Sequence, residues 1–271
     1  MSETSRLVLA RSPLPEHEAI RLLALATGRN SVQIRLGIEL TPTELLAFEE
    51  MSARRRGGEP LQYIEGSVPF GPIIVSVDER VLVPRTETEE LFEIVSVLSP
   101  PEVVVDLCTG SGNLALALAS TFPHATVLAT DISSDAVAVA TENARRAELD
   151  VTVLVGDLFD PLPPHLRGQV DLIVANPPYL AEREYADLPE DVRREPTLAL
   201  VAGPTGLEVI ERIAAGTPSW LRPGGTIVCE VSEFHAPEAA EAFSDLHPVV
   251  KQDLGGKHRF IIGHRSSEVA E

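Results

Sequence analysis

The chain has 271 residues, of which 44% are hydrophobic and 23% charged, a composition typical of a folded globular protein rather than a disordered or collagen-like one. Its length fits one large domain or two unequal ones. Asp and Glu number 41 against 22 Lys and Arg, so the formal net charge is −19. Such an acidic chain lacks the basic footprint of a general nucleic-acid-binding protein, although a local basic patch is compatible with it.

The sequence also bears on where the protein works. No apolar run approaches the roughly 18 residues of a membrane helix, and residues 1–11 lack the apolar core and cleavage pattern of a secretory signal. Cys108 and Cys229 lie in strand-like apolar contexts and are too few for a disulfide framework. We therefore expect a cytoplasmic protein that contacts no membrane, and we expect a monomer.

Residues 1–61 predict a small helical domain. Apolar residues recur at helical spacing along Glu16–Thr27, and Gly28 should end that helix. Thr41 is a plausible N-cap for a second helix, because Pro42 follows it at the first helical position and Glu44 completes a capping box.

Residues 62–83 predict a β-hairpin linker between two domains. Residues 62–64 and 73–77 are rich in β-branched and aromatic side chains, and glycine and proline interrupt the stretch between them. The basic triplet at residues 54–56 just before this linker suits the C-terminal end of a helix.

Residues 84–271 alternate between apolar strands and amphipathic helices. Strands are expected at residues 103–107, 126–130, 151–155, 170–175 and 226–231, with two short ones near 249 and at 259–262. Helices are expected at residues 113–120, 133–147, 205–215 and 237–246. This alternation predicts an α/β fold with a mostly parallel sheet and helices on both faces.

A glycine-rich loop follows the first of these strands and leads directly into a helix. It consists of Cys108, Thr109, Gly110, Ser111 and Gly112. The glycines let the backbone turn tightly and approach a ligand, and the helix N-terminus offers free N–H groups. The loop fits a nucleotide-binding fingerprint; the alternative is a tight strand–helix turn that binds nothing.

Acidic residues end the next two strands. Asp131 can accept both ribose hydroxyls of an adenosyl group, or it can cap the helix that starts near Ser133. Asp157 can accept from an exocyclic adenine amine, with Leu158 packing on the ring; a solvent-facing carboxylate is the alternative. Because ligands bind at the carboxyl ends of parallel strands, these residues together predict a nucleoside site.

The fourth strand runs into Asn176, Pro177, Pro178 and Tyr179. Two consecutive prolines fix the backbone and lack N–H donors, so the Pro177 carbonyl is free to point outward beside the Asn176 amide oxygen. Two acceptors held side by side match a substrate –NH₂ group, and Tyr179 offers a ring face for a planar group. A rigid β-turn without a ligand is the alternative.

The glycine loop, Asp131 and the Asn-Pro-Pro-Tyr segment, in this order, resemble the amino-group methyltransferases that use S-adenosylmethionine, and more narrowly the release factor glutamine methyltransferases. The likeness covers about the whole chain and includes residues 58–66, 83–91, 188–200 and 253–259. The chain departs from that family at three places. Cys108 stands where the family usually has glycine, Thr86 replaces a proline, and Ser232 ends a segment that usually reads Glu-Ile-Gly.

The resemblance implies a Rossmann-like methyltransferase fold over residues 84–271, with S-adenosylmethionine held by the glycine loop, Asp131, Asp157, Leu158 and Asn176. It implies methyl transfer to the side-chain amide nitrogen of a glutamine, in the Gly-Gly-Gln motif of a peptide chain release factor. Asn176 and Pro177 would accept the two N–H bonds of that amide. The helical domain would recognise the protein substrate, and no metal site is expected.

Other functions fit the same motifs less fully. The site could serve an N-methyltransferase acting on another protein or on a small amide or amine. A DNA adenine methyltransferase is disfavoured by the net charge of −19 and the aromatic content of 4%, because base flipping calls for basic grooves and aromatic wedges. A dinucleotide oxidoreductase would leave the Asn-Pro-Pro-Tyr segment without a role.

Overall fold

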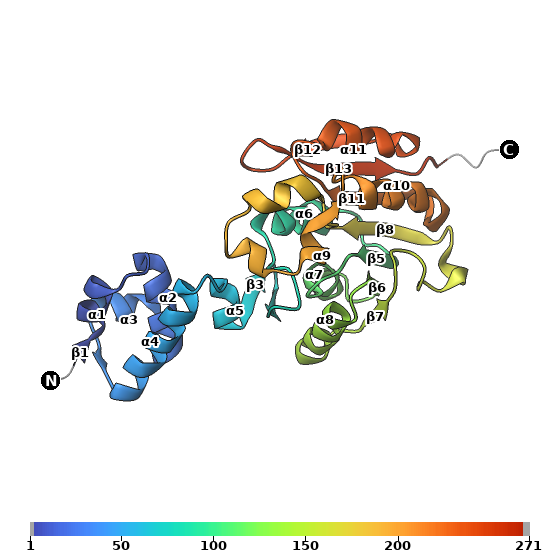
Figure 1. Ribbon diagram of the computed structural model, residues 1–271. Coiled ribbons are helices and arrows are strands. Elements are labelled where there is room, and N and C mark those ends of the chain that lie inside the picture. Colours follow the sequence, from blue (N-terminus) through green and yellow to red (C-terminus); the bar gives the residue numbers. More distant parts are fainter. Residues whose placement is uncertain (1–2, 268–271) are drawn as a thin grey trace. The chain divides into compact units, whose positions relative to one another are not determined.

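The computed structural model describes residues 3–267, which form two compact units (Figure 1). The first contains residues 3–66 together with the short segment Glu190–Arg194. The second contains Ser67–Pro189 and residues 195–267.

The first unit is helical, as predicted. Its elements are β1 (Glu3–Thr4), α1 (Ser5–Arg11), α2 (Glu16–Thr27), α3 (Ser31–Leu36), β2 (Glu39–Leu40), α4 (Pro42–Arg56), α5 (Leu61–Glu65) and η3 (Val192–Arg194). Helix α2 has the predicted bounds, and Gly28 ends it in the left-handed conformation at φ 65°. The capping box of α4 is present, with the Glu44 amide donating to Thr41 Oγ1 at 3.2 Å and the Thr41 amide to Glu44 Oε2 at 2.7 Å.

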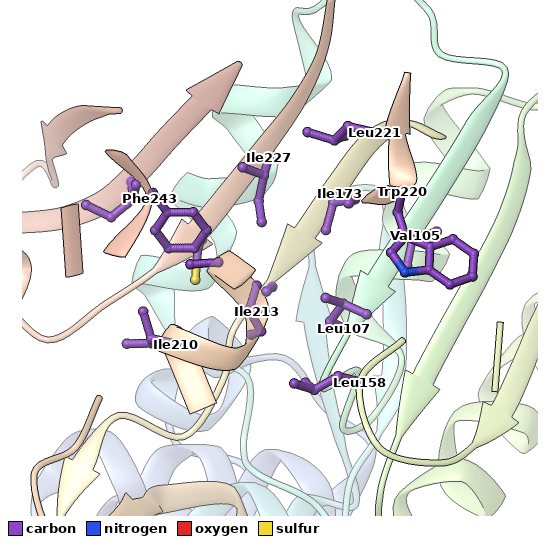
Figure 2. Packing of buried hydrophobic residues seen from close by; sticks show 14 of the residues in the cluster. Val105, Leu107, Leu158, Ile173, Ile210, Ile213, Trp220, Leu221, Ile227 and Phe243 are labelled. Atoms are coloured by element: carbon purple, nitrogen blue, oxygen red, sulfur yellow. The ribbon is translucent and has the colours of Figure 1, made fainter. Parts of the chain in front are cut away.

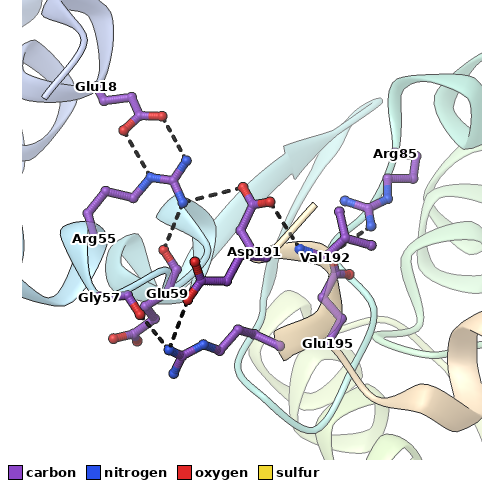
Figure 3. Close-up of polar contacts among 10 residues, drawn as sticks. Glu18, Arg55, Gly57, Glu59, Arg85, Asp191, Val192 and Glu195 are labelled. Atoms are coloured by element: carbon purple, nitrogen blue, oxygen red, sulfur yellow. Dashed lines mark hydrogen bonds and ion pairs between the residues drawn. The ribbon is translucent and has the colours of Figure 1, made fainter. Parts of the chain in front are cut away.

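A guanidinium joins the inserted segment to the rest of the first unit. Arg55 at the end of α4 donates through Nε and Nη2 to the two carboxylate oxygens of Glu18, both at 2.9 Å, and through Nη1 to Asp191 Oδ2 at 3.3 Å (Figure 3). The paired guanidinium holds the pKa of Glu18 below its ordinary value. Arg55 thereby links two helices of this unit to a residue far along the chain.

The prediction of a strand at residues 62–64 is wrong, because these residues belong to helix α5. Pro60 precedes the helix with a fixed φ of −52°, and Gly66 ends it at φ 74°. Leu61 and Ile64, three residues apart on one helical face, are buried in the core of the first unit. The hairpin is shorter than predicted and lies in the second unit, as strands β3 (Ser67–Phe70) and β4 (Ile73–Ser76).

The second unit is built on a seven-stranded sheet in the order β12-β13-β11-β8-β5-β6-β7. Its strands are β5 (Val103–Leu107), β6 (Thr126–Asp131), β7 (Val151–Val155), β8 (Val170–Ala175), β11 (Leu221–Glu230), β12 (Val249–Gln252) and β13 (His258–His264). The neighbours from β11 to β7 pair in parallel, whereas β13 pairs antiparallel with both β11 and β12. The predicted mostly parallel sheet is therefore present, with an antiparallel edge.

Helices and short elements complete the second unit. They are α6 (Thr86–Ser96), α7 (Asn113–Thr121), α8 (Ser134–Ala147), η1 (Pro164–Leu166), β9 (Leu180–Ala181), η2 (Glu182–Asp187), α9 (Thr197–Leu200), β10 (Val201–Gly203), α10 (Glu208–Trp220), α11 (Ala236–Ala242) and η4 (Ser244–Leu246). No helix among residues 3–267 is both long and apolar enough to span a membrane.

Alternation along the strands places helices on both faces of the sheet. On one face Val105 and Ile173 pack with residues of α10 and α11, and part of this cluster is drawn in Figure 2. Val104 and Leu172 directly precede these two residues in the sequence and point to the other face. There they pack with residues of α6 and α7. Both faces of the central strands are thus covered, as expected for a sheet of near-continuous apolar strands.

The strand order fixes where a ligand can bind. The chain passes from β5 to β6 and β7 on one side of β5, and then crosses back to β8 on the other side. Connections that leave β5 and β8 in opposite directions open a crevice at the carboxyl ends of these strands. The glycine loop follows β5 and the Asn-Pro-Pro-Tyr segment follows β8, so both flank this switch point.

Candidate active site

The two glycines of the glycine loop have different roles. Both adopt left-handed conformations, at φ 54° for Gly110 and 82° for Gly112. A Cβ at Gly110 would meet no atom of the described part of the chain within 4 Å, so the loop is open at this point. A Cβ at Gly112 would lie 3.1 Å from the Cβ of Ala140 in α8, so this glycine permits close packing of the loop against that helix.

Asp131 at the end of β6 holds the glycine loop. Its Oδ2 accepts from the Gly110 amide and its Oδ1 from the Ser133 amide, both at 2.9 Å. Burial raises the pKa of Asp131 above its ordinary value. The N-cap of α8 is Ser133, whose Oγ accepts from the Ala136 amide at 3.2 Å. Asp131 therefore joins two backbone segments beside the crevice, and each of its oxygens has lone-pair capacity left for ribose hydroxyls.

Most of the predicted site residues line one cavity within the second unit. The predicted residues in its wall are Cys108, Thr109, Gly110, Ser111, Asp131, Asp157, Leu158, Asn176 and Pro178. Gly112, Pro177 and Tyr179 are not in that wall. Tyr179 instead packs partly against the sheet face that carries α10 and α11.

Asp157 and Leu158 follow β7 at the edge of the cavity. Asp157 Oδ2 lies 2.6 Å from Nη2 of Arg212, a cavity residue on α10 that gave no sequence signal. Leu158 is buried and adopts a φ of 49°, which is rare for a leucine. Cys108 adopts a similar left-handed conformation at φ 58°, and a glycine would take that conformation without strain.

The Asn176 side chain is held by two residues that sequence reasoning assigned no role. Asn176 Nδ2 donates to Thr88 Oγ1 at 2.8 Å, and Thr88 Oγ1 donates to Glu230 Oε2, also at 2.8 Å. The other oxygen of Glu230 accepts from the Tyr179 hydroxyl at 3.4 Å. Burial raises the pKa of Glu230 to about 7. Thr88 stands three residues before buried Leu91 and Glu230 ends an apolar strand, and these signals indicate that each residue is buried but not that their side chains meet.

Asp106, the penultimate residue of β5, also lines the cavity. Its Oδ2 accepts from Thr109 Oγ1 at 2.5 Å and from the Ala115 amide at 3.1 Å. Its Oδ1 is buried and has no hydrogen-bond partner among residues 3–267, and burial raises the pKa of the carboxyl to about 7. A buried carboxylate oxygen without a partner beside a cavity fits a ligand that brings a donor or a positive charge.

Asn143 in α8 connects the glycine loop with the hairpin. Its Nδ2 donates to the carbonyls of Ser111 at 2.9 Å and Ser76 at 3.0 Å, and its Oδ1 accepts from the Ser76 amide at 2.9 Å. The side chain of Asn143 is buried, and its bond to Ser111 is buried with it, whereas the two bonds to Ser76 are partly buried. Among residues 3–267, no group of His, Cys, Asp and Glu side chains could hold a metal ion.

Comparison with known proteins identifies the family. Residues 3–66 match the model of the PrmC N-terminal domain, and residues 88–192 match the methyltransferase small domain. A protein of Mycolicibacterium smegmatis named release factor glutamine methyltransferase is 38% identical, over 97% of this chain and 95% of its own. One of the same name from Deinococcus radiodurans is also 38% identical, over 97% and 96%. The chain belongs to the release factor glutamine methyltransferase family.

Solved structures agree with the fold. A methyltransferase from Pyrococcus furiosus superposes with a TM-score of 0.53 at 20% identity, over 71% of this chain and 88% of its own. A 16S rRNA methyltransferase from T. thermophilus, solved with AdoMet and guanosine, gives a TM-score of 0.52 at 19% identity, over 73% and 49%. At these identities they support the Rossmann-like methyltransferase fold alone.

Membership in the release factor glutamine methyltransferase family confirms the predicted enzyme class, a methyltransferase with S-adenosylmethionine as methyl donor. The cavity residues fit such a donor. The unpartnered Oδ1 of Asp106 suits an ammonium group, and the open surface over Gly110 leaves room for the ligand. Asp131 suits a ribose, because it retains acceptor capacity beside the glycine loop.

Proposed function

We propose that the protein methylates the side-chain amide nitrogen of a glutamine, in the Gly-Gly-Gln motif of a peptide chain release factor. The observation that carries this proposal is the orientation of Asn176. Its Nδ2 is engaged by Thr88, so its Oδ1 is the atom left to accept from a substrate in the cavity that Asn176 lines. The names of the relatives from Mycolicibacterium smegmatis and Deinococcus radiodurans support the same substrate.

The chemistry follows from the weak nucleophilicity of an amide nitrogen, whose lone pair is delocalised. Bound S-adenosylmethionine would supply the methyl group from its positively charged sulfur, which becomes a neutral thioether as the sulfur–methyl bond breaks. The methylated amide nitrogen gives up one of its two protons to water. In the proposed site, Asn176 Oδ1 and the Pro177 carbonyl accept the two N–H bonds of the glutamine amide. Holding both hydrogens orients the nitrogen lone pair toward the methyl group and favours its pyramidalisation.

The proposed donor site uses the residues that follow β5, β6 and β7. The glycine loop, residues 108–112, takes the methionine part, and Asp106 takes its ammonium group. Asp131 accepts the ribose hydroxyls. Asp157 accepts from the adenine amine while Leu158 packs on the ring. The ion pair between Asp157 and Arg212 fixes the Asp157 carboxylate at the cavity edge.

We also propose a division of labour along the chain. Residues 1–61 form the domain that recognises the protein substrate, residues 62–83 link the domains, and residues 84–271 carry the methyltransferase. A cytoplasmic monomer that binds neither DNA nor membranes fits a release-factor substrate and the net charge of −19.

The test is a methylation assay with an intact protein substrate. Purified enzyme is incubated with isotope-labelled S-adenosylmethionine and a release factor, and the Gly-Gly-Gln peptide is examined by mass spectrometry. We expect one methyl group on the glutamine side chain. A release factor with alanine in place of that glutamine is the matched control and should stay unlabelled. Label on another residue, or equal label on the control, would overturn the proposal.

A further inference from the structure

Three side chains from separate elements form one line of hydrogen bonds at the cavity, and two of them, Asn176 and Thr88, line its wall. Asn176 follows β8, Thr88 lies in the first turn of α6, and Glu230 ends β11. The donor–acceptor distances from Asn176 Nδ2 to Thr88 Oγ1 and from Thr88 Oγ1 to Glu230 Oε2 are both 2.8 Å. Thr88 and Glu230 are each 1% exposed, so water does not compete for these bonds.

The direction of these bonds follows from the ionised form of Glu230. Above its raised pKa of about 7, the Glu230 carboxylate has no hydrogen and can only accept. The single hydroxyl hydrogen of Thr88 is therefore donated to Glu230. The Thr88 oxygen has no further hydrogen and can only accept from Asn176. The –NH₂ of the amide satisfies that acceptor, whereas a flipped amide would place its oxygen against the Thr88 oxygen with no hydrogen between them. The carboxylate thus sets which end of the Asn176 amide faces away from Thr88.

We propose that Thr88 and Glu230 are positioning residues for methyl transfer, and that Glu230, acting through Thr88, keeps Asn176 Oδ1 directed at the substrate amide. This inference rests on the proposed function of Asn176. A flipped amide would present its own –NH₂ to the –NH₂ of the substrate, and two donors cannot pair. Neither Thr88 nor Glu230 needs to touch the reacting atoms for this role.

Paired substitutions at each position separate the hydrogen bond from the space that the side chain fills. Thr88→Val keeps the shape and removes the hydroxyl, whereas Thr88→Ser keeps the hydroxyl. Glu230→Met removes the acceptor, whereas Glu230→Gln keeps one oxygen that can accept from Thr88. Thr217→Val is the matched control, because Thr217 is equally buried and donates only within α10, to the Ile213 carbonyl at 2.7 Å.

The measurements are the single-turnover rate of glutamine methylation and the affinity for S-adenosylmethionine, both taken above pH 7, where Glu230 is ionised. We expect Thr88→Val and Glu230→Met to lower the rate about tenfold or more, the equivalent of about one lost hydrogen bond. Thr88→Ser and Glu230→Gln should restore most of it, Thr217→Val should leave it unchanged, and cofactor affinity should change little throughout. Thermal unfolding of each variant confirms that it folds. If Thr88→Val or Glu230→Met does not fold, Thr88→Ser and Glu230→Gln still provide variants whose rate and affinity can be measured.

A double-mutant cycle shows whether Thr88 acts through Asn176. In an Asn176→Ala background there is no amide to orient, so adding Thr88→Val should cause no further loss of rate. An equal loss in both backgrounds, or a wild-type rate in Thr88→Val, would overturn the inference while leaving the proposed function in place. A wild-type protein that leaves the glutamine unmodified would overturn the proposed function and this inference with it.

Discussion

Replacing Asn143 by leucine tests how the glycine loop is held. The side chain makes three hydrogen bonds, two partly buried ones to the backbone of Ser76 and a buried one to the Ser111 carbonyl, at donor–acceptor distances between 2.9 and 3.0 Å. Leucine has a similar volume and can make none of them. At about 1 kcal/mol net for each bond, the free energy of unfolding should fall by about 3 kcal/mol. That is a large fraction of the roughly 5–15 kcal/mol that stabilises a typical protein.

Urea unfolding and calorimetric titration with S-adenosylmethionine measure the two consequences. Because Ser111 belongs to the glycine loop, the affinity of Asn143→Leu for the cofactor should fall at least about tenfold, or roughly 1.4 kcal/mol. Thr217→Val loses a single buried bond and should cost only about 1 kcal/mol, with unchanged affinity. Asn143→Leu with no greater loss of stability than this control, and with wild-type affinity, would refute the reasoning.

Three further predictions concern residues of the cavity wall. Asp131→Ala should weaken S-adenosylmethionine binding at least about tenfold by calorimetry, since a charged acceptor is lost; unchanged affinity in a folded variant would remove Asp131 from the site. Because Cys108 has a φ of 58°, Cys108→Gly should be more stable than Cys108→Ala by about 1 kcal/mol in urea unfolding, and the reverse order would contradict strain there. Since burial raises the pKa of Asp106 to about 7, the folded state keeps its proton to higher pH than the unfolded state. Stability of the cofactor-free protein should therefore fall as pH rises from about 5 to about 7, and Asp106→Asn should flatten that slope; an unaltered slope would exclude Asp106 as its source.

Much of the fold follows from local signals in the sequence. Helix α2 and strands β5 and β8 have the predicted bounds, because amphipathic spacing and short apolar runs are patterns that lie within each element's own residues. The nine predicted residues that line the cavity could also be predicted from local signals. Strand ends in a parallel sheet meet at one edge, so a motif such as the glycine loop can be placed once its strand is recognised.

The rest depends on contacts between segments distant in sequence. Thr88, Asn143 and Glu230 lie in different elements, and no local pattern shows that their side chains meet Asn176 or the glycine loop. Residues 62–64 have strand-like composition, but burial of Leu61 and Ile64 in the first unit decides for a helix. At residues 62–64, tertiary packing overrides the local preference for a strand.

Single-turnover methylation and cofactor titration of Asn176→Ala test the central claim most directly. The substitution removes one of the two proposed acceptors for the glutamine amide and leaves the Asp131 and glycine-loop contacts in place. The rate of the chemical step should fall by about 10²-fold or more, as for loss of one positioned polar group in a preorganised site, while cofactor affinity changes much less. A large loss of cofactor affinity with little change in the chemical step would contradict the account.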